Sequence, residues 1–173
     1  MKNDFQEDLK YSLNAEHDKL FNDLYSKKFP HLERIEIVND IQKQKKGIDK
    51  ILHLKCGKTI FIDEKKRRKD YGDILIEEYS DFENKKVGWI GGEKHTDYIV
   101  YLIVPSKIVY FLPFTILQLA WIDNWRSWLE LYGRKFAKNK HYTTSSIAIP
   151  ERVLFKAMYN QMKMIIHNTN RNT

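Results

Sequence analysis

Apolar residues recur at helical spacing in three regions of the chain. Residues 4–28 carry them three or four positions apart, which is typical of an amphipathic helix, and Pro30 closes the segment. The same spacing predicts a helix over 114–132, where Gly133 is a natural stop, and a last helix that begins at Pro150. The apolar positions of these helices are Phe5, Leu9, Leu13, Leu20, Phe21 and Leu24; Leu117, Trp121, Trp125, Trp128 and Leu129; and Val153, Leu154, Ala157, Met158 and Met162.

Between the helical regions, short apolar runs bounded by turn residues predict strands. The clearest pair is a hairpin with strands at 48–55 and 58–66 and a tight turn at Cys56-Gly57-Lys58. The polar, lysine-rich residues 42–46 ahead of it are predicted to form a loop or a strand edge. A second hairpin is expected to turn at Pro105-Ser106. The remaining predicted strands are 35–38, 73–79, 96–104, 107–112 and 145–149.

The composition fits one globular domain that spans residues 1–173. Hydrophobic residues make up 42% and aromatic residues 13% of the chain, which is enough for a substantial core. The single cysteine, Cys56, excludes an internal disulfide and a cysteine-rich zinc site, so a reducing interior is the expected setting. The polar N-terminus does not read as a signal peptide, and the interrupted apolar run at 108–122 is too short to span a bilayer. We therefore expect a cytoplasmic protein with no membrane partner.

The first hairpin carries two acids and a lysine on neighbouring strands. Asp49 follows Gly47 and Ile48 at the start of the first strand, and Asp63 and Lys65 lie in the second. Asp63 and Lys65 are two positions apart, so their side chains leave the same face of the strand. Carboxylates are hard oxygen ligands for Mg²⁺, and a nearby ammonium can hold a water or the charge that develops on a phosphate. The grouping therefore suits metal-assisted cleavage of a phosphodiester.

This arrangement resembles the active site of the PD-(D/E)XK nucleases, the restriction-endonuclease-like superfamily. Asp49 matches the first acid of their motif, Asp63 the second and Lys65 the lysine. The resemblance covers residues 34–81 well and the remainder loosely. It departs from the motif at Ile48, where a proline is usual.

The sequence is closer still to a group of phage and bacterial proteins of this superfamily. They carry a glutamine three residues before Gly-Ile-Asp, here Gln44, and an Ile-Asp-Glu-Lys strand, here residues 62–65. By this resemblance Gln44 would position a water on the metal or a phosphate. The group also has an acid on the next strand, for which Glu77 and Glu78 are both candidates; the spacing of Glu77 to Ser80 favours Glu77.

The resemblance implies an α/β (α+β) protein with a restriction-endonuclease-like core, in which a central mixed sheet is flanked by helices in the order α-β-β-β-α-β. The order of the predicted elements agrees with that core. The implied activity is DNA hydrolysis that leaves a 5′-phosphate, with Mg²⁺ (or Mn²⁺) as cofactor, by a resolvase-like or restriction-like enzyme. The resemblance also suggests a phage origin, which would place the protein in the host cytoplasm, and a homodimer, since cutting both strands of a duplex often uses one.

In such a site Asp49 and Asp63 would hold the metal, joined by Glu77 and by the carbonyl of Glu64. Lys65 would orient or help deprotonate the attacking water and stabilise the pentacovalent phosphate. The ordinary alternative is a solvated strand end at residues 63–69 and, for Glu77, a surface acid on an edge strand.

The register of the motif has two solutions. Glu64 and Lys66 also fit the acid-x-lysine spacing, on the face opposite Asp63 and Lys65. Residues 59–62 are apolar on both faces, so periodicity does not choose between the two. The family pattern favours Asp63 and Lys65, and Glu64 remains the alternative catalytic acid and metal ligand.

Charge is distributed unevenly around the motif. The chain has a net charge of +7, and residues 42–69 contain eleven Lys and Arg against three acids, whereas residues 70–83 contain six acids and no base. Positive charge around the motif favours a polyanionic partner, which we expect to be DNA, with RNA not excluded. Two alternatives stay open: a nuclease-fold protein that binds nucleic acid without cutting it, and a phage accessory protein that binds a host protein.

Overall fold

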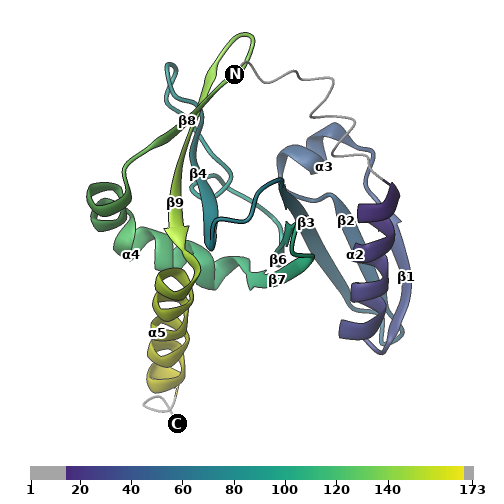
Figure 1. Cartoon of the computed structure of the whole chain (residues 1–173). Coiled ribbons are helices and arrows are strands. Elements are labelled where there is room, and N and C mark those ends of the chain that lie inside the picture. The colour runs from purple at the N-terminus through teal and green to yellow at the C-terminus, as the bar shows by residue number, and fades with distance from the viewer. Residues whose placement is uncertain (1–14, 170–173) are drawn as a thin grey trace. The chain divides into compact units, whose positions relative to one another are not determined.

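The computed structural model describes residues 15–169, and the chain clusters into two compact units (Figure 1). The first unit comprises Met1–Arg68 and Glu93–Phe111, and the second comprises Lys69–Gly92 and Leu112–Thr173. The expectation of a single domain stays a prediction, because a compact cluster of contacts is not by itself an independently folding domain. None of the helices in the described part of the chain is long and apolar enough to cross a membrane.

The first unit is built on a five-stranded mixed sheet. Its order is β1-β2-β3-β6-β7. Strands β1, β2 and β3 are antiparallel neighbours, and β6 runs parallel to β3. Both predicted hairpin pairs are thus neighbours in the sheet, and the mixed α+β class is confirmed. The strands are β1 (Leu32–Ile37), β2 (Lys50–Leu54), β3 (Thr59–Arg67), β6 (Tyr98–Ile103) and β7 (Ile108–Pro113).

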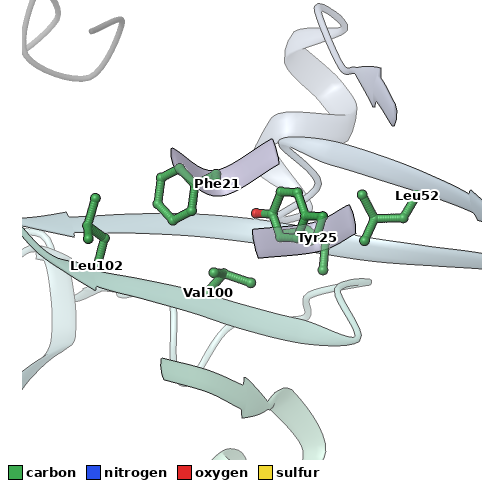
Figure 2. Close-up of a cluster of buried hydrophobic side chains, with 6 residues drawn as sticks. Phe21, Tyr25, Leu52, Val100 and Leu102 are labelled. Carbon is green, nitrogen blue, oxygen red and sulfur yellow. The ribbon is translucent and has the colours of Figure 1, made fainter. Parts of the chain in front are cut away.

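Helix α2 (Ala15–Lys28) covers one face of this sheet. Its spacing places Phe21 and Tyr25 one turn apart, and both are buried against Leu52, Val100 and Leu102 (Figure 2). The two rings stack with centroids 6.2 Å apart. The predicted helix is therefore confirmed over 15–28, and residues 4–14, with Phe5, Leu9 and Leu13, lie outside the described residues.

A smaller apolar group lies where β1 leads into the hairpin. Val38, Ile48 and Ile51 are buried together, and Phe61 packs against them. Between Val38 and Ile48 the chain forms a short helix, α3 (Ile41–Lys45). The prediction of a loop or strand edge here was wrong. Asp40 caps this helix by accepting hydrogen bonds from the backbone N–H groups of residues 42 and 43, which satisfies donors that a helix start leaves free.

The third predicted strand, β4 (Asp73–Asp81), does not join the sheet that carries β3. It pairs with β5 (Lys86–Val87) and β9 (Thr143–Pro150) in a separate four-stranded sheet of the second unit. The expectation that three consecutive strands would carry the acids side by side was therefore wrong. The physical reason is that β2 and β6 already occupy both edges of β3.

The second unit has the sheet order β5-β4-β9-β8, with β8 at Lys135–Lys138. Helices α4 (Phe114–Tyr132) and α5 (Glu151–Thr169) pack on each other and on β9. Helix α4 ends as predicted: Gly133 adopts φ 64° and donates its N–H to the carbonyl of Leu129. Trp121 and Trp128 are buried, which confirms their role in the core.

A buried ion pair stabilises the end of the second sheet. Two guanidinium nitrogens of Arg134 donate to the carboxylate of Glu78, each at 2.8 Å, and Ser145 donates to the same carboxylate at 3.3 Å. This pairing satisfies a glutamate that is almost fully buried.

Gly88 lies close to the backbone of another segment of this unit. Its substitution therefore tests how closely it packs on β4. A Cβ at this position would lie 2.3 Å from the backbone oxygen of Glu77, which cannot move without bending the strand. We expect Gly88→Ala to destabilise the protein by about 1–3 kcal/mol or more. Urea denaturation followed by tryptophan fluorescence measures this, because all four tryptophans lie in the second unit.

Gly91→Ala is the matched control in the same loop. A Cβ there would meet only the side chain of Val87, at 2.8 Å, and that side chain is half exposed and able to shift. Equal losses in the two variants would contradict a specific clash with the backbone of β4.

Candidate functional site

Strand β3 presents different side chains on its two faces. Asp63 and Lys65 follow Phe61 on one face, as the alternation of a strand requires. Ile62 and Glu64 face α2 instead: Ile62 belongs to the core around Tyr25, and the Tyr25 hydroxyl donates to Glu64 at 2.6 Å. The two acid-x-lysine registers therefore occupy opposite faces of the same strand.

Asp63 is the most deeply buried acid of the first face. It is 1% exposed, and its Oδ1 accepts a hydrogen bond from the ammonium of Lys65. Its Oδ2 is buried and has no hydrogen-bond donor among the described residues. Burial raises the pKa of Asp63 to about 6, with Lys65 opposing the rise and the charge of Asp49 adding to it.

Asp49 is fixed beside Asp63 by three hydrogen bonds. Its backbone N–H donates to the carbonyl of Ile62 at 2.8 Å, and its carbonyl accepts from Val38 at 2.9 Å. Its Oδ2 accepts the backbone N–H of Glu64 at 2.9 Å. The first acid is thus attached to the strand that carries the second. Because ionised carboxylates only accept hydrogen bonds, those of Asp49 and Asp63 can be bridged only by a proton or a cation.

The turn that delivers Asp49 requires glycine. Gly47 has φ +77°, and its N–H donates to the carbonyl of Gln44 at 2.9 Å. A Cβ on Gly47 would lie 3.2 Å from Oδ2 of Asp63 and 3.1 Å from Cδ of Lys94. The glycine therefore meets both a conformational and a steric requirement next to the buried carboxylate.

Gln44 supports the backbone of the site. Its side-chain nitrogen donates to the carbonyl of Val38 at 2.8 Å, and the N–H of Val38 is the donor to Asp49. Gln44 therefore braces the segment that holds Asp49, whereas the sequence analysis expected it to contact a water or a phosphate.

Glu64 lies on the helix side of the sheet, in a buried charged network. Lys50 donates to its carboxylate at 2.9 Å, and the two side chains are only 5% and 8% exposed. Asp18 lies 3.6 Å from the same lysine and 3.8 Å from Lys66. The structure thus places the carboxylate of Glu64 on the face opposite Asp63, and it is the backbone N–H of Glu64 that contacts Asp49.

Glu77 does not belong to the sheet that carries Asp63. It lies in β4 of the second unit, where it pairs with Ser146 of β9. Of the six predicted residues, the structure brings together the side chains of Asp49, Asp63 and Lys65, with Gln44 behind them.

Lys94 borders the site and was missed by the sequence analysis. It belongs to the segment that enters β6, and its Cδ approaches Gly47 next to Asp63, as noted above. Its Nζ donates to the carbonyl of Lys45 at 2.8 Å. No local pattern signals this placement, because it depends on the parallel pairing of β3 with β6.

The donor set fits a hard divalent cation. Asp49 and Asp63 offer carboxylate oxygens, and one of these oxygens is buried without a hydrogen-bond donor in the described chain. No three His, Cys, Asp or Glu side chains converge within residues 15–169. Two carboxylates suffice for Mg²⁺, which keeps most of its waters and takes one or two protein carboxylates.

No protein-family model, curated protein or solved structure matches this chain significantly.

The raised pKa of Asp63 predicts a particular pH dependence of stability in the absence of metal. The folded state binds this proton more tightly than the unfolded state, so the contribution of Asp63 to stability is fully present below about pH 4 and is lost as the pH rises to about 6. The difference between the ordinary pKa of 3.8 and the pKa of about 6 in the folded protein corresponds to roughly 3 kcal/mol in the free energy of unfolding. Urea denaturation in EDTA, followed by far-UV circular dichroism, measures the slope.

Two variants isolate the contribution of Asp63. Asp63→Asn should lose the downward slope, and Lys65→Met should extend it to higher pH, because the ammonium that opposes the rise is gone. If wild type and Asp63→Asn gave parallel curves from pH 4 to pH 7, the carboxyl would not be buried as described.

The Lys50–Glu64 pair should dominate the stability of the first unit. Lys50→Met leaves a buried carboxylate without its cation, and we expect a loss of about 3–5 kcal/mol. The double variant Lys50→Met/Glu64→Gln should recover most of that loss, because a neutral amide still accepts the Tyr25 hydroxyl. Far-UV circular dichroism in urea gives both values.

Lys46→Met is the matched control for a lysine in an exposed ion pair. Lys46 lies 3.4 Å from Glu93, and the two side chains are 45% and 81% exposed, so its loss should cost less than about 1 kcal/mol. Similar losses for Lys46→Met and Lys50→Met would argue against a buried pair.

Proposed function

We propose that this chain is a metal-dependent nuclease that hydrolyses DNA phosphodiester bonds, with a site of the PD-(D/E)XK type. The observation that carries the proposal is the gathering of Asp49, Asp63 and Lys65 on one face of the β2–β3 hairpin. One oxygen of this group, Oδ2 of Asp63, is buried and has no hydrogen-bond donor in the described residues. The carboxyl of Asp63 is held where its burial is costly, which is typical of functional sites.

Asp49 and Asp63 would hold Mg²⁺ or Mn²⁺, which when bound stabilises the negative charge that develops on the phosphate. Lys65 is oriented by its hydrogen bond to Asp63, and its side chain is 29% exposed. It would orient the attacking water and stabilise the equatorial phosphate oxygens. The water oxygen bonds to phosphorus as the bond to the 3′ oxygen breaks, which leaves a 5′-phosphate.

The fold gives partial support. In the first unit, a helix precedes three antiparallel strands, and β6 then lies parallel to β3, as in the α-β-β-β-α-β core. The connection from β3 to β6 departs from that core. Residues 68–97 contain β4 and β5 of the second unit and no helix, where the resembled family has one. We therefore propose a restriction-endonuclease-like core with a substituted crossover.

DNA is the proposed partner because positive charge dominates residues 42–69, which include the site. A cytoplasmic location, in a phage host if the protein is phage-encoded, and a homodimer belong to the same proposal.

Cleavage of supercoiled plasmid and of branched DNA with Mg²⁺, Mn²⁺ or EDTA tests the activity. We expect metal-dependent cutting that Asp63→Asn and Lys65→Met each reduce by at least about 100-fold, because each removes a group that acts on the reacting phosphate. Glu64→Gln is the control for the register and should retain activity within about tenfold, because its amide oxygen can still accept the hydrogen bonds of Lys50 and Tyr25 that fix the spacing of the strands. Circular dichroism confirms that each variant is folded.

Cutting that survives Asp63→Asn and Lys65→Met but is lost in Glu64→Gln would move the site to the helix side of the sheet. Plasmid that is bound but never cut, under any of the three conditions, would favour a nucleic-acid-binding protein without nuclease activity.

A further inference from the structure

We infer that Lys94 is a second cationic residue of this site, which binds a backbone phosphate of the nucleic acid beside the phosphate that is cut. The inference rests on the proposed function and adds a residue outside the motif. Three observations support it. Lys94 lies next to Asp63, hydrogen bonds hold the backbone on either side of it, and its ammonium donates to a backbone carbonyl.

Lys94 and Asp63 lie against the same glycine. The point where a Cβ of Gly47 would stand is 3.1 Å from Cδ of Lys94, 3.6 Å from its Cβ and 3.2 Å from Oδ2 of Asp63. The aliphatic stem of Lys94 therefore covers the turn immediately beside the buried carboxylate oxygen. By the inference, the ammonium on this stem turns from the carbonyl of Lys45 to a phosphate that approaches the acids.

The segment that bears Lys94 is fixed on both sides. The N–H of His95 donates to the carbonyl of Lys46 at 2.8 Å. Two residues on, Asp97 exchanges hydrogen bonds with the backbone of Phe61 at 2.8 and 2.9 Å, and the Thr96 hydroxyl donates to the Phe61 carbonyl at 3.0 Å. The backbone of Lys94 is thus held in register with β3, so its side chain starts from a defined point.

The ammonium of Lys94 donates a hydrogen bond to a backbone carbonyl, and a phosphate oxygen could take the place of this acceptor. Its Nζ donates to the backbone carbonyl of Lys45, at the last residue of α3, and the side chain is half-buried. A phosphate oxygen carries a formal charge, whereas a carbonyl carries only a partial one, so the charge-assisted bond is the stronger. Lys43, Lys45 and Lys46 are exposed around the same turn and add to the positive potential.

The competing account is that Lys94 only stabilises the C-terminal end of α3. Such a role would affect folding and leave nucleic-acid binding unchanged. The two accounts therefore differ in the salt dependence of binding, because each phosphate contact adds to the number of counterions released.

Fluorescence anisotropy of a labelled DNA duplex, titrated in EDTA at several NaCl concentrations, tests the inference. We expect Lys94→Met to lower affinity and to reduce the slope of log K against log salt by about 0.9, the value for one phosphate contact. Lys94→Arg should restore the slope. Lys58→Met, at the exposed turn at the other end of the hairpin, is the matched control and should keep the slope of wild type.

An unchanged slope in Lys94→Met, with wild-type DNA binding intact, would overturn the role of Lys94 and leave the proposed nuclease standing. Wild-type protein that binds no duplex at any salt concentration would also overturn the role of Lys94. The nuclease is judged separately by the cleavage assay with Mg²⁺ or Mn²⁺, so failure of the inference and failure of the proposed function are distinguishable.

Discussion

The candidate site depends on a buried ion pair on the other side of its own sheet. Lys50 and Glu64 meet at 2.9 Å beneath α2, and each directly follows one of the acids, Asp49 and Asp63, in the chain. Successive residues of a strand point to opposite faces, so a contact on the helix face fixes the spacing of the carboxylates on the other. The Tyr25 hydroxyl completes this contact, and the backbone N–H of Glu64 extends it to Asp49.

The two faces of β3 differ in how completely their charged side chains are paired. The charges on the helix face are matched, since Glu64 has both a cation and a hydroxyl donor. The charges on the site face are not, since Asp63 lies beside the charge of Asp49 and its Oδ2 has no donor in the described chain. A buried, incompletely paired carboxylate lowers the stability of the folded state. Its presence beside a satisfied network is the reason to attribute a function to the site face.

The sequence predicted the individual helices and strands better than it predicted which strands pair with each other. The hairpin, the second helix with its stop at Gly133 and the pairing of Asp63 with Lys65 follow from spacing and turn chemistry, which are local. The register was open because residues 59–62 are apolar on both faces, and only the position of α2 separates Glu64 from Asp63. Helix α3 was missed because its stability comes from the Asp40 cap rather than from apolar periodicity.

The non-local errors share one cause, which is the crossover after β3. Sequence order suggested β4 as the next neighbour, but β3 pairs with β6, and the stretch between them belongs largely to the second unit. That pairing sets Lys94 beside the turn of Gly47, and no spacing rule reaches across such an insertion. The contacts of Asp49, Asp63 and Lys94 described above all join residues of the first unit. The insertion therefore separates these residues in the sequence, and the pairing of β3 with β6 brings them together again.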